Sequence, residues 1–143
     1  MKNSIKPEEQ IVDLIKKNHH LYEGTFSALV DGVEFMRANT NVLFHKAEKD
    51  YFIIGEGKKN EDYVTFCVKQ DLENEGPHKV EKYKGGLVWS VKIKDIFHEI
   101  RQGQANVTFL QRGEYRYGAF GAIDFVLPDE RKITGKFEIK RRE

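Results

Sequence analysis

Cysteine is almost absent from this sequence, because Cys67 is the only one among the 143 residues. An intramolecular disulfide is therefore excluded, which is typical of a reducing compartment. The sequence also lacks any run of about 18 apolar residues, and the residues before Pro7 lack the apolar segment of a signal peptide. These absences predict no membrane span and favour a cytoplasmic location, although removal of an upstream signal would leave the same sequence.

An excess of charge of either sign is also lacking. The 24 basic and 23 acidic side chains leave a formal net charge of +1. No overall field would attract nucleic acid or anionic lipid, so either partner would need a local patch. With 39% hydrophobic and 33% charged residues, the composition excludes a disordered chain. The length predicts one globular domain, residues 1–143.

Aromatic residues are frequent, with ten Phe, six Tyr and one Trp, and they suit half-buried strands. From residue 21 onward, apolar side chains recur at every second position. Phe26 and Ala28 share one face, and Asp31 and Gly32 form a two-residue turn that permits positive φ. Residues 21–38 are therefore predicted to form a β-hairpin.

The segment before this hairpin has helical periodicity. Pro7 suits the first turn of a helix. Ile11, Leu14 and Ile15 have the i, i+3, i+4 spacing of one narrow apolar face. Residues 7–18 are predicted to form a helix that lies on the body of the domain.

The remaining chain predicts further strands, separated by turns rich in Gly, Pro and acidic residues. We expect a loop at residues 71–79 and one helical turn at residues 95–103, which begin with Asp and end with Gly. The predicted strands comprise residues 42–46, 51–55, 64–68, 87–93, 106–112, 114–126 and 132–140. The fold class is thus all-β and mainly antiparallel, with about nine strands in a β-sandwich or a closed barrel over residues 21–140.

Two segments resemble a known group of proteins. Residues 24–35 (GTFSALVDGVEF) and 133–139 (ITGKFEI) are similar to the opening hairpin and the closing strand of small bacterial β-sandwich domains of unknown function. Many members of that group are exported lipoproteins anchored by a lipidated cysteine. This sequence has no cysteine near its start, so the resemblance implies a fold and carries over neither export nor anchoring.

The sequence contains no G-x-S-x-G, P-loop or G-x-G-x-x-G motif. His19 and His20 are adjacent and would point in different directions, which suits a solvated helix end better than a metal site. The other histidines lie far apart. Cys67 is expected to be a small, partly buried thiol. We therefore predict no catalytic residues, no metal and no cofactor.

The candidate binding residues are aromatic and arginine side chains. Phe109, Arg112, Tyr115, Arg116 and Tyr117 follow one another in two predicted strands. Tyr and Arg are typical of surfaces that bind protein, glycan or single-stranded nucleic acid. The alternation favours another interpretation, in which Tyr115 and Tyr117 face the core and Arg116 faces solvent.

The leading hypothesis is a non-catalytic binding module for a protein partner or for a small apolar or aromatic ligand. A ligand held inside the domain would have a cavity lined by Trp89 and by inward Phe and Tyr side chains. An edge strand could also pair two copies into a homodimer.

Two alternatives stay open. An enzyme, such as a hydrolase or isomerase in a β-barrel, would need polar groups that converge in a cleft. The residues considered for it are His45, His98, Glu114 and Asp124, although Asp124 is expected to face solvent or a partner. A weak nucleic-acid binder would use a basic surface, and the near-neutral net charge argues against it. The residues considered for that surface are Lys92, Lys94, Arg112 and Arg116.

Overall fold

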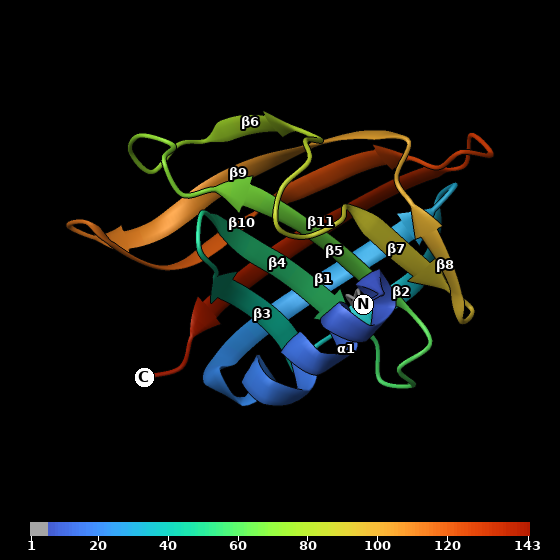
Figure 1. Ribbon diagram of the computed structural model, residues 1–143, viewed down its shortest axis with the longest axis horizontal. Helices are drawn as coiled ribbons and strands as arrows, with labels where there is room; N and C mark the ends of the chain where they lie inside the picture. Colours follow the sequence, from blue (N-terminus) through green and yellow to red (C-terminus); the bar gives the residue numbers. More distant parts are fainter. Residues whose placement is uncertain (1–5) are drawn as a thin grey trace, which may run out of the picture.

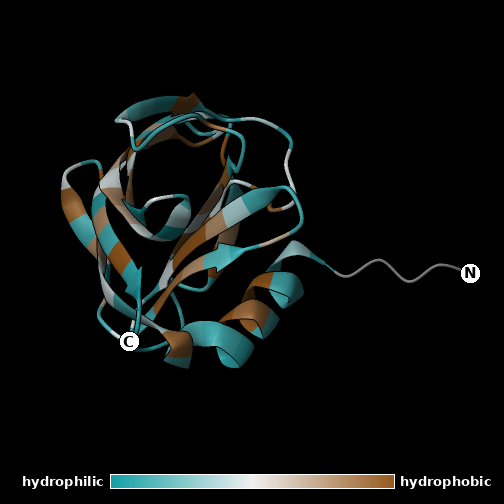
Figure 2. Cartoon of the chain, turned by 90° about the vertical axis from the view of Figure 1, so that its left-hand side faces the viewer, coloured by the Kyte–Doolittle hydropathy of each residue, from teal (hydrophilic) through white to brown (hydrophobic). Residues whose placement is uncertain are grey.

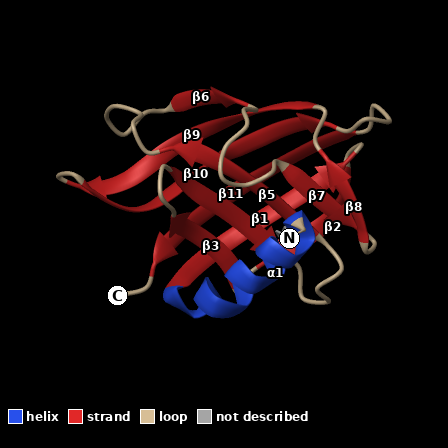
Figure 3. Ribbon diagram, viewed as in Figure 1, coloured by secondary structure: helices blue, strands red, loops and turns tan. Residues whose placement is uncertain are grey.

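The computed structural model describes residues 6–143, which form one α-helix and eleven strands in two antiparallel sheets (Figure 1 and Figure 3). The six-stranded sheet has the order β2-β1-β11-β10-β9-β6, and the five-stranded sheet has the order β3-β4-β5-β7-β8. The elements are α1 (Pro7–Asn18), the short 3-10 helix η1 (His19–Leu21), β1 (Tyr22–Val30), β2 (Val33–Ala38), β3 (Asn41–Lys46), β4 (Asp50–Glu56), β5 (Tyr63–Lys69), β6 (His78–Glu81), β7 (Ser90–Ile93), β8 (Ile96–Glu99), β9 (Gln102–Arg112), β10 (Tyr115–Val126) and β11 (Lys132–Arg141).

The mainly antiparallel all-β fold with one helix at its front is confirmed. Strands β1 and β11 of the larger sheet contact β3 of the smaller sheet. Within residues 6–143 the two sheets do not close into a barrel, so the sandwich alternative fits the arrangement better. The first hairpin forms as predicted, with β1 and β2 joined by Asp31 and Gly32, which both have positive φ.

The predicted helix is also present, from Pro7 to Asn18, and it lies on the outside of the strands (Figure 2). Its apolar side chains Ile11 and Ile15 are buried, and α1 contacts β3. No helix among residues 6–143 is long and apolar enough to cross a bilayer.

The predicted helical turn at residues 95–103 is wrong, because this segment forms β8 and enters β9. Lys94 and Asp95 have φ of 49° and 70°, and Ile93 pairs with Ile96 across them. Positive φ at both central residues makes a type I′ hairpin, which usually carries Asn-Gly or Asp-Gly. A Lys-Asp turn lacks that signal. The predicted loop at residues 71–79 is also too long, since β6 begins within it. Together β6 and β8 raise the strand number from about nine to eleven.

Aromatic rings fill the interior between the sheets. Trp89 and Phe125 lie 5.4 Å apart between ring centroids, and Phe66 lies 5.3 Å from Trp89 and 5.9 Å from Phe125. The relative exposure of Trp89 is only 1%. Trp89 is thus part of the packed core, and the rings around it take the space that an internal ligand would need.

Two glycines flank β11 at the same level. Gly24 on β1 lies opposite Ile139, and Gly118 on β10 lies opposite Lys140. A Cβ on Gly24 would overlap the Glu138 carbonyl oxygen and come within 2.9 Å of the Ile139 Cα. In the same way, a Cβ on Gly118 would overlap the Ile139 carbonyl oxygen and come within 2.9 Å of the Lys140 Cα. Both neighbouring strands therefore approach β11 more closely than a side chain would allow.

Candidate functional site

The β9–β10 hairpin carries four of the six sequence-predicted binding residues. Arg112, Tyr115, Arg116 and Tyr117 lie on either side of its turn, which forms one end of the molecule along its longest axis (Figure 1). The other two residues, Trp89 and Phe109, are each only 1% exposed and belong to the core.

A register shift in β10 reverses the faces of the sheet on which the alternation places Tyr115 and Arg116. The pairing between β9 and β10 is irregular between Arg116 and Gly118, which leaves Tyr117 without a partner in the ladder. Such a bulge turns the side chains beyond it to the opposite face. Tyr115 is consequently 57% exposed, while Arg116 is half-buried. The interpretation that placed Tyr115 in the core and Arg116 in solvent is wrong.

Arg116 ties the hairpin to the loop that follows β5. Its guanidinium donates hydrogen bonds to the carbonyl oxygens of Gln70, Leu72 and Asn74, at 3.1 Å for both Gln70 and Asn74. The same group lies 4.0 Å from the centroid of the Phe109 ring, a cation–π geometry. All these partners are neutral, and within residues 6–143 no carboxylate lies within 4.0 Å of the Arg116 guanidinium. Arg116 therefore holds the hairpin in place and keeps its positive charge.

A small groove of about 180 Å³ lies beside Arg116. We call it the tyrosine–arginine groove, and it is lined by Tyr22, Phe44, Lys46, Tyr51, Glu114, Tyr115, Arg116, Tyr117 and Arg141. The rings of Phe44 and Tyr51 stack with centroids 4.5 Å apart. Arg141 lies 6.0 Å from the centroid of Tyr22, whose hydroxyl has a raised pKa, chiefly because of burial. The groove thus combines aromatic faces with cations, of which Arg116 is held by hydrogen bonds.

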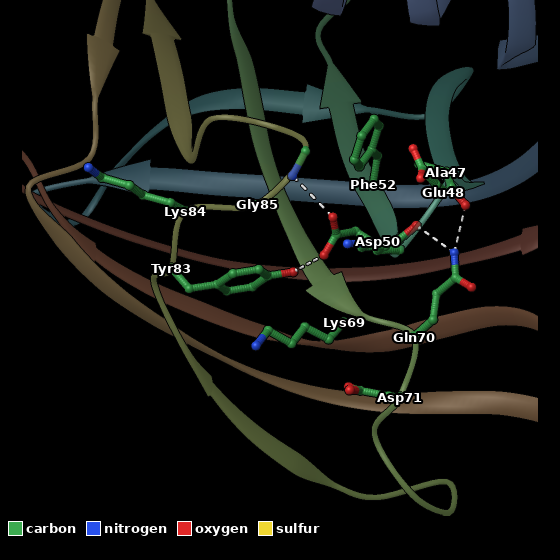
Figure 4. A pocket seen from close by; sticks show the side chains of 12 residues that line it. Ala47, Glu48, Asp50, Phe52, Lys69, Gln70, Asp71, Tyr83, Lys84 and Gly85 are labelled. Atoms are coloured by element: carbon green, nitrogen blue, oxygen red, sulfur yellow. Dashed lines mark hydrogen bonds between the residues drawn. The ribbon is translucent and has the colours of Figure 1, made fainter.

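A larger hollow of about 770 Å³ opens on the other side of the β3–β4 turn (Figure 4). We call it the Asp50 cleft, and its lining residues come from that turn, from the start of β4, from the end of β5 and the residues after it, and from the loop between β6 and β7. They are Ala47, Glu48, Lys49, Asp50, Phe52, Lys69, Gln70, Asp71, Tyr83, Lys84, Gly85 and Gly86. This cleft could not be predicted from the sequence, because Asp50, Lys69 and Tyr83 lie in distant segments that only the fold brings together. The two glycines at 85 and 86 were its one local signal.

The residues considered for an enzyme do not converge. His45 lies on β3 and His98 on β8, the two opposite edges of the five-stranded sheet. Glu114 lies in the β9–β10 turn, whereas Asp124 lies near the far end of β10 and is exposed, as predicted. No group of three or more His, Cys, Asp or Glu side chains within residues 6–143 could hold a metal ion.

The basic residues considered for nucleic acid are also divided. Lys92 lies on β7 of the smaller sheet, and its ammonium group pairs with Asp95 at 3.1 Å. Arg112 lies on β9 of the larger sheet, where its guanidinium sits 5.2 Å from the centroid of the Tyr117 ring and 3.3 Å from Glu143. These side chains therefore do not form one continuous basic surface.

His45 makes the stability of the protein depend on pH. It is half-buried, and burial lowers the pKa of its imidazole below about 6.5, the usual value. The folded protein thus binds fewer protons at this site than the unfolded chain, so the stabilisation is complete above about pH 6.5 and is lost as the pH falls towards the folded-state pKa. We expect His45→Gln to remove this part of the pH dependence. Urea unfolding at pH 8 and pH 5 measures it, and an unchanged difference between the two pH values would contradict it.

Comparison with known proteins gave no match, whether against family models, curated proteins or solved structures. The resemblance of residues 24–35 and 133–139 to small bacterial β-sandwich domains therefore stays a prediction.

Proposed function

We propose that this protein is a non-catalytic binding module that recognises a protein partner through the tyrosine–arginine groove and the adjoining β9–β10 hairpin. The observation that carries the proposal is Tyr115, which is 57% exposed next to the half-buried Tyr117, with 6.2 Å between the ring centroids. Tyrosine and arginine are enriched among the residues that contribute most of the binding energy near the centres of protein interfaces.

The hairpin suits this role because its base is held firmly. Arg116 binds three backbone carbonyl groups of the 70–74 segment, which anchors the strand that carries the tyrosines. A surface that is already ordered loses less conformational entropy on binding than a mobile one.

The charge of the groove favours an acidic segment of the partner. Lys46, Arg116 and Arg141 line it, and Glu114 is its only acidic lining residue. A volume of about 180 Å³ is close to that of one large side chain. Three cations in so small a space make few phosphate contacts, whereas nucleic-acid affinity at physiological salt depends on many. We therefore favour a peptide with an acidic anchor residue.

A peptide library displayed on phage tests this proposal. Selection on the wild-type protein is expected to enrich sequences with acidic residues, and Tyr115→Ala should weaken their binding by about tenfold or more. Val33→Ala is the matched control, because Val33 is also exposed, at 67%, and lies on β2 away from the hairpin. Failure to enrich any peptide, or equal losses in the two variants, would contradict the proposal. A single-stranded oligonucleotide that outcompetes the selected peptides would indicate the nucleic-acid alternative instead.

A further inference from the structure

The buried carboxylate of Asp50 lies in the Asp50 cleft and holds the loop between β6 and β7 by hydrogen bonds. Asp50 is only 7% exposed. Its Oδ1 accepts a hydrogen bond of 2.5 Å from the Tyr83 hydroxyl, and its Oδ2 accepts one of 3.0 Å from the Gly86 backbone N–H (Figure 4). Burial, followed by the bond to Asp50, raises the pKa of Tyr83. The loop between β6 and β7 is thereby held over the end of the smaller sheet.

Glycines bring this loop close to the sheet. A Cβ on Gly85 would lie 2.7 Å from the Cys67 Sγ, and a Cβ on Gly86 would lie 3.0 Å from the Phe52 ring. Cys67 is fully buried, more than the sequence predicted, and burial raises the pKa of its thiol. Because residues 85 and 86 have no side chains, the loop can lie this close to Cys67 and Phe52.

The aromatic wall of the cleft is Tyr83, which is half-buried. The ammonium group of Lys69 lies 5.3 Å from the centroid of its ring. Tyr83 is therefore fixed by Asp50 at one end and faces a cation at its ring, an arrangement that suits a flat ligand with a charged substituent.

Among the charged side chains that line the cleft and accept or donate no hydrogen bond to Asp50, three lysines stand against two acids. Both oxygens of Asp50 already accept hydrogen bonds. By contrast, Lys49, Lys69 and Lys84 line the cleft, and within residues 6–143 none of these three ammonium groups has a carboxylate within 4.0 Å. Two acids, Glu48 and Asp71, also line the cleft and are exposed, as the three lysines are.

We infer that the Asp50 cleft binds a small aromatic anion, such as an aromatic carboxylate, sulfonate or phosphate. Its ring would pack on Tyr83, and its anionic group would pair with Lys69, assisted by Lys49 or Lys84. This site is separate from the tyrosine–arginine groove, and the inference does not depend on the protein partner proposed above. The two sites have no lining residue in common. They adjoin at the β3–β4 turn and at Gln70, whose carbonyl oxygen accepts a hydrogen bond from Arg116.

The dye 8-anilinonaphthalene-1-sulfonate, an aromatic anion, is the probe. Trp89 is the only tryptophan of the chain, and its ring lies 6.3 Å from that of Tyr83, so energy transfer from Trp89 will report the bound dye. The Lys69 variant described below assigns the bound dye to the cleft. We expect saturable 1:1 binding to the native protein, and affinity for the cationic dye thioflavin T that is weaker by about tenfold or more.

Lys69→Glu should lower the affinity for the anionic dye by about tenfold, because it replaces an attraction by a repulsion. Lys136→Glu makes the same change of charge at an exposed position of β11 outside the cleft, and should leave the affinity unchanged. An unchanged Trp89 emission spectrum of each free variant would show that the core is intact. Equal binding of the two dyes, or equal effects of the two substitutions, would overturn the inference without affecting the peptide experiment.

Discussion

Replacing Asp50 with alanine is expected to lower the free energy of unfolding by about 3 kcal/mol, since hydrogen bonds to a charged group contribute about 1.5–3 kcal/mol each. The side chain is 7% exposed and accepts two hydrogen bonds. Alanine would leave the Tyr83 hydroxyl and the Gly86 N–H without their acceptor. Urea unfolding followed by Trp89 fluorescence measures the loss.

The matched control for this substitution is Glu48→Ala, two residues earlier in the chain. Glu48 is an exposed acid at the rim of the same cleft, and its removal should change the free energy of unfolding by less than about 0.5 kcal/mol. Similar effects of the two substitutions would show that Asp50 does not hold the loop.

Gly24→Ala is expected to cost more than about 3 kcal/mol, in the range where backbone strain and overpacking add together. Gly24 has φ of +137°, and a Cβ there would overlap the Glu138 carbonyl oxygen of β11. Neither the positive φ nor the overlap can be relieved by moving a side chain, because both involve backbone atoms inside the six-stranded sheet. Thermal and urea unfolding would both detect the loss.

Gly32→Ala distinguishes the effect of backbone strain on stability from the effect of steric overlap. Gly32 also has positive φ, +84°, but nothing lies within 4 Å of a Cβ at this turn position. Its substitution should therefore cost only the positive-φ penalty, about 1 kcal/mol. If both variants lost the same stability, the close approach of β1 to β11 would not be the cause.

Much of the fold was predictable from local pattern. The i, i+3, i+4 spacing of Ile11, Leu14 and Ile15 predicts α1, and period-two alternation around Asp31 and Gly32 predicts the first hairpin; both are present. The β7–β8 hairpin was not predictable, because its turn uses Lys94 and Asp95 with positive φ, residues that do not signal such a turn.

The candidate sites were predictable only in part. The sequence drew attention to Arg112, Tyr115 and Tyr117, which the structure places together at the hairpin. It could not show which way Arg116 points, because one irregular position before Gly118 reverses the alternation. The Asp50 cleft could not be predicted as a site, because Asp50, Lys69 and Tyr83 belong to distant segments that come together only through the strand order.

The pairing of β1 with β11 also sets the order in which the protein can fold. Tyr22 lies opposite Arg141 and Val30 lies opposite Ile133, so one of the first strands to be synthesised needs the last as its neighbour. To form contacts so distant in sequence, the chain must close a long loop, which costs conformational entropy before the contacts can stabilise the fold. Domains rich in such contacts fold in roughly milliseconds to seconds. During translation, β1 can pair with β2 at once. Its other edge stays open to wrong partners until residues 132–141 emerge.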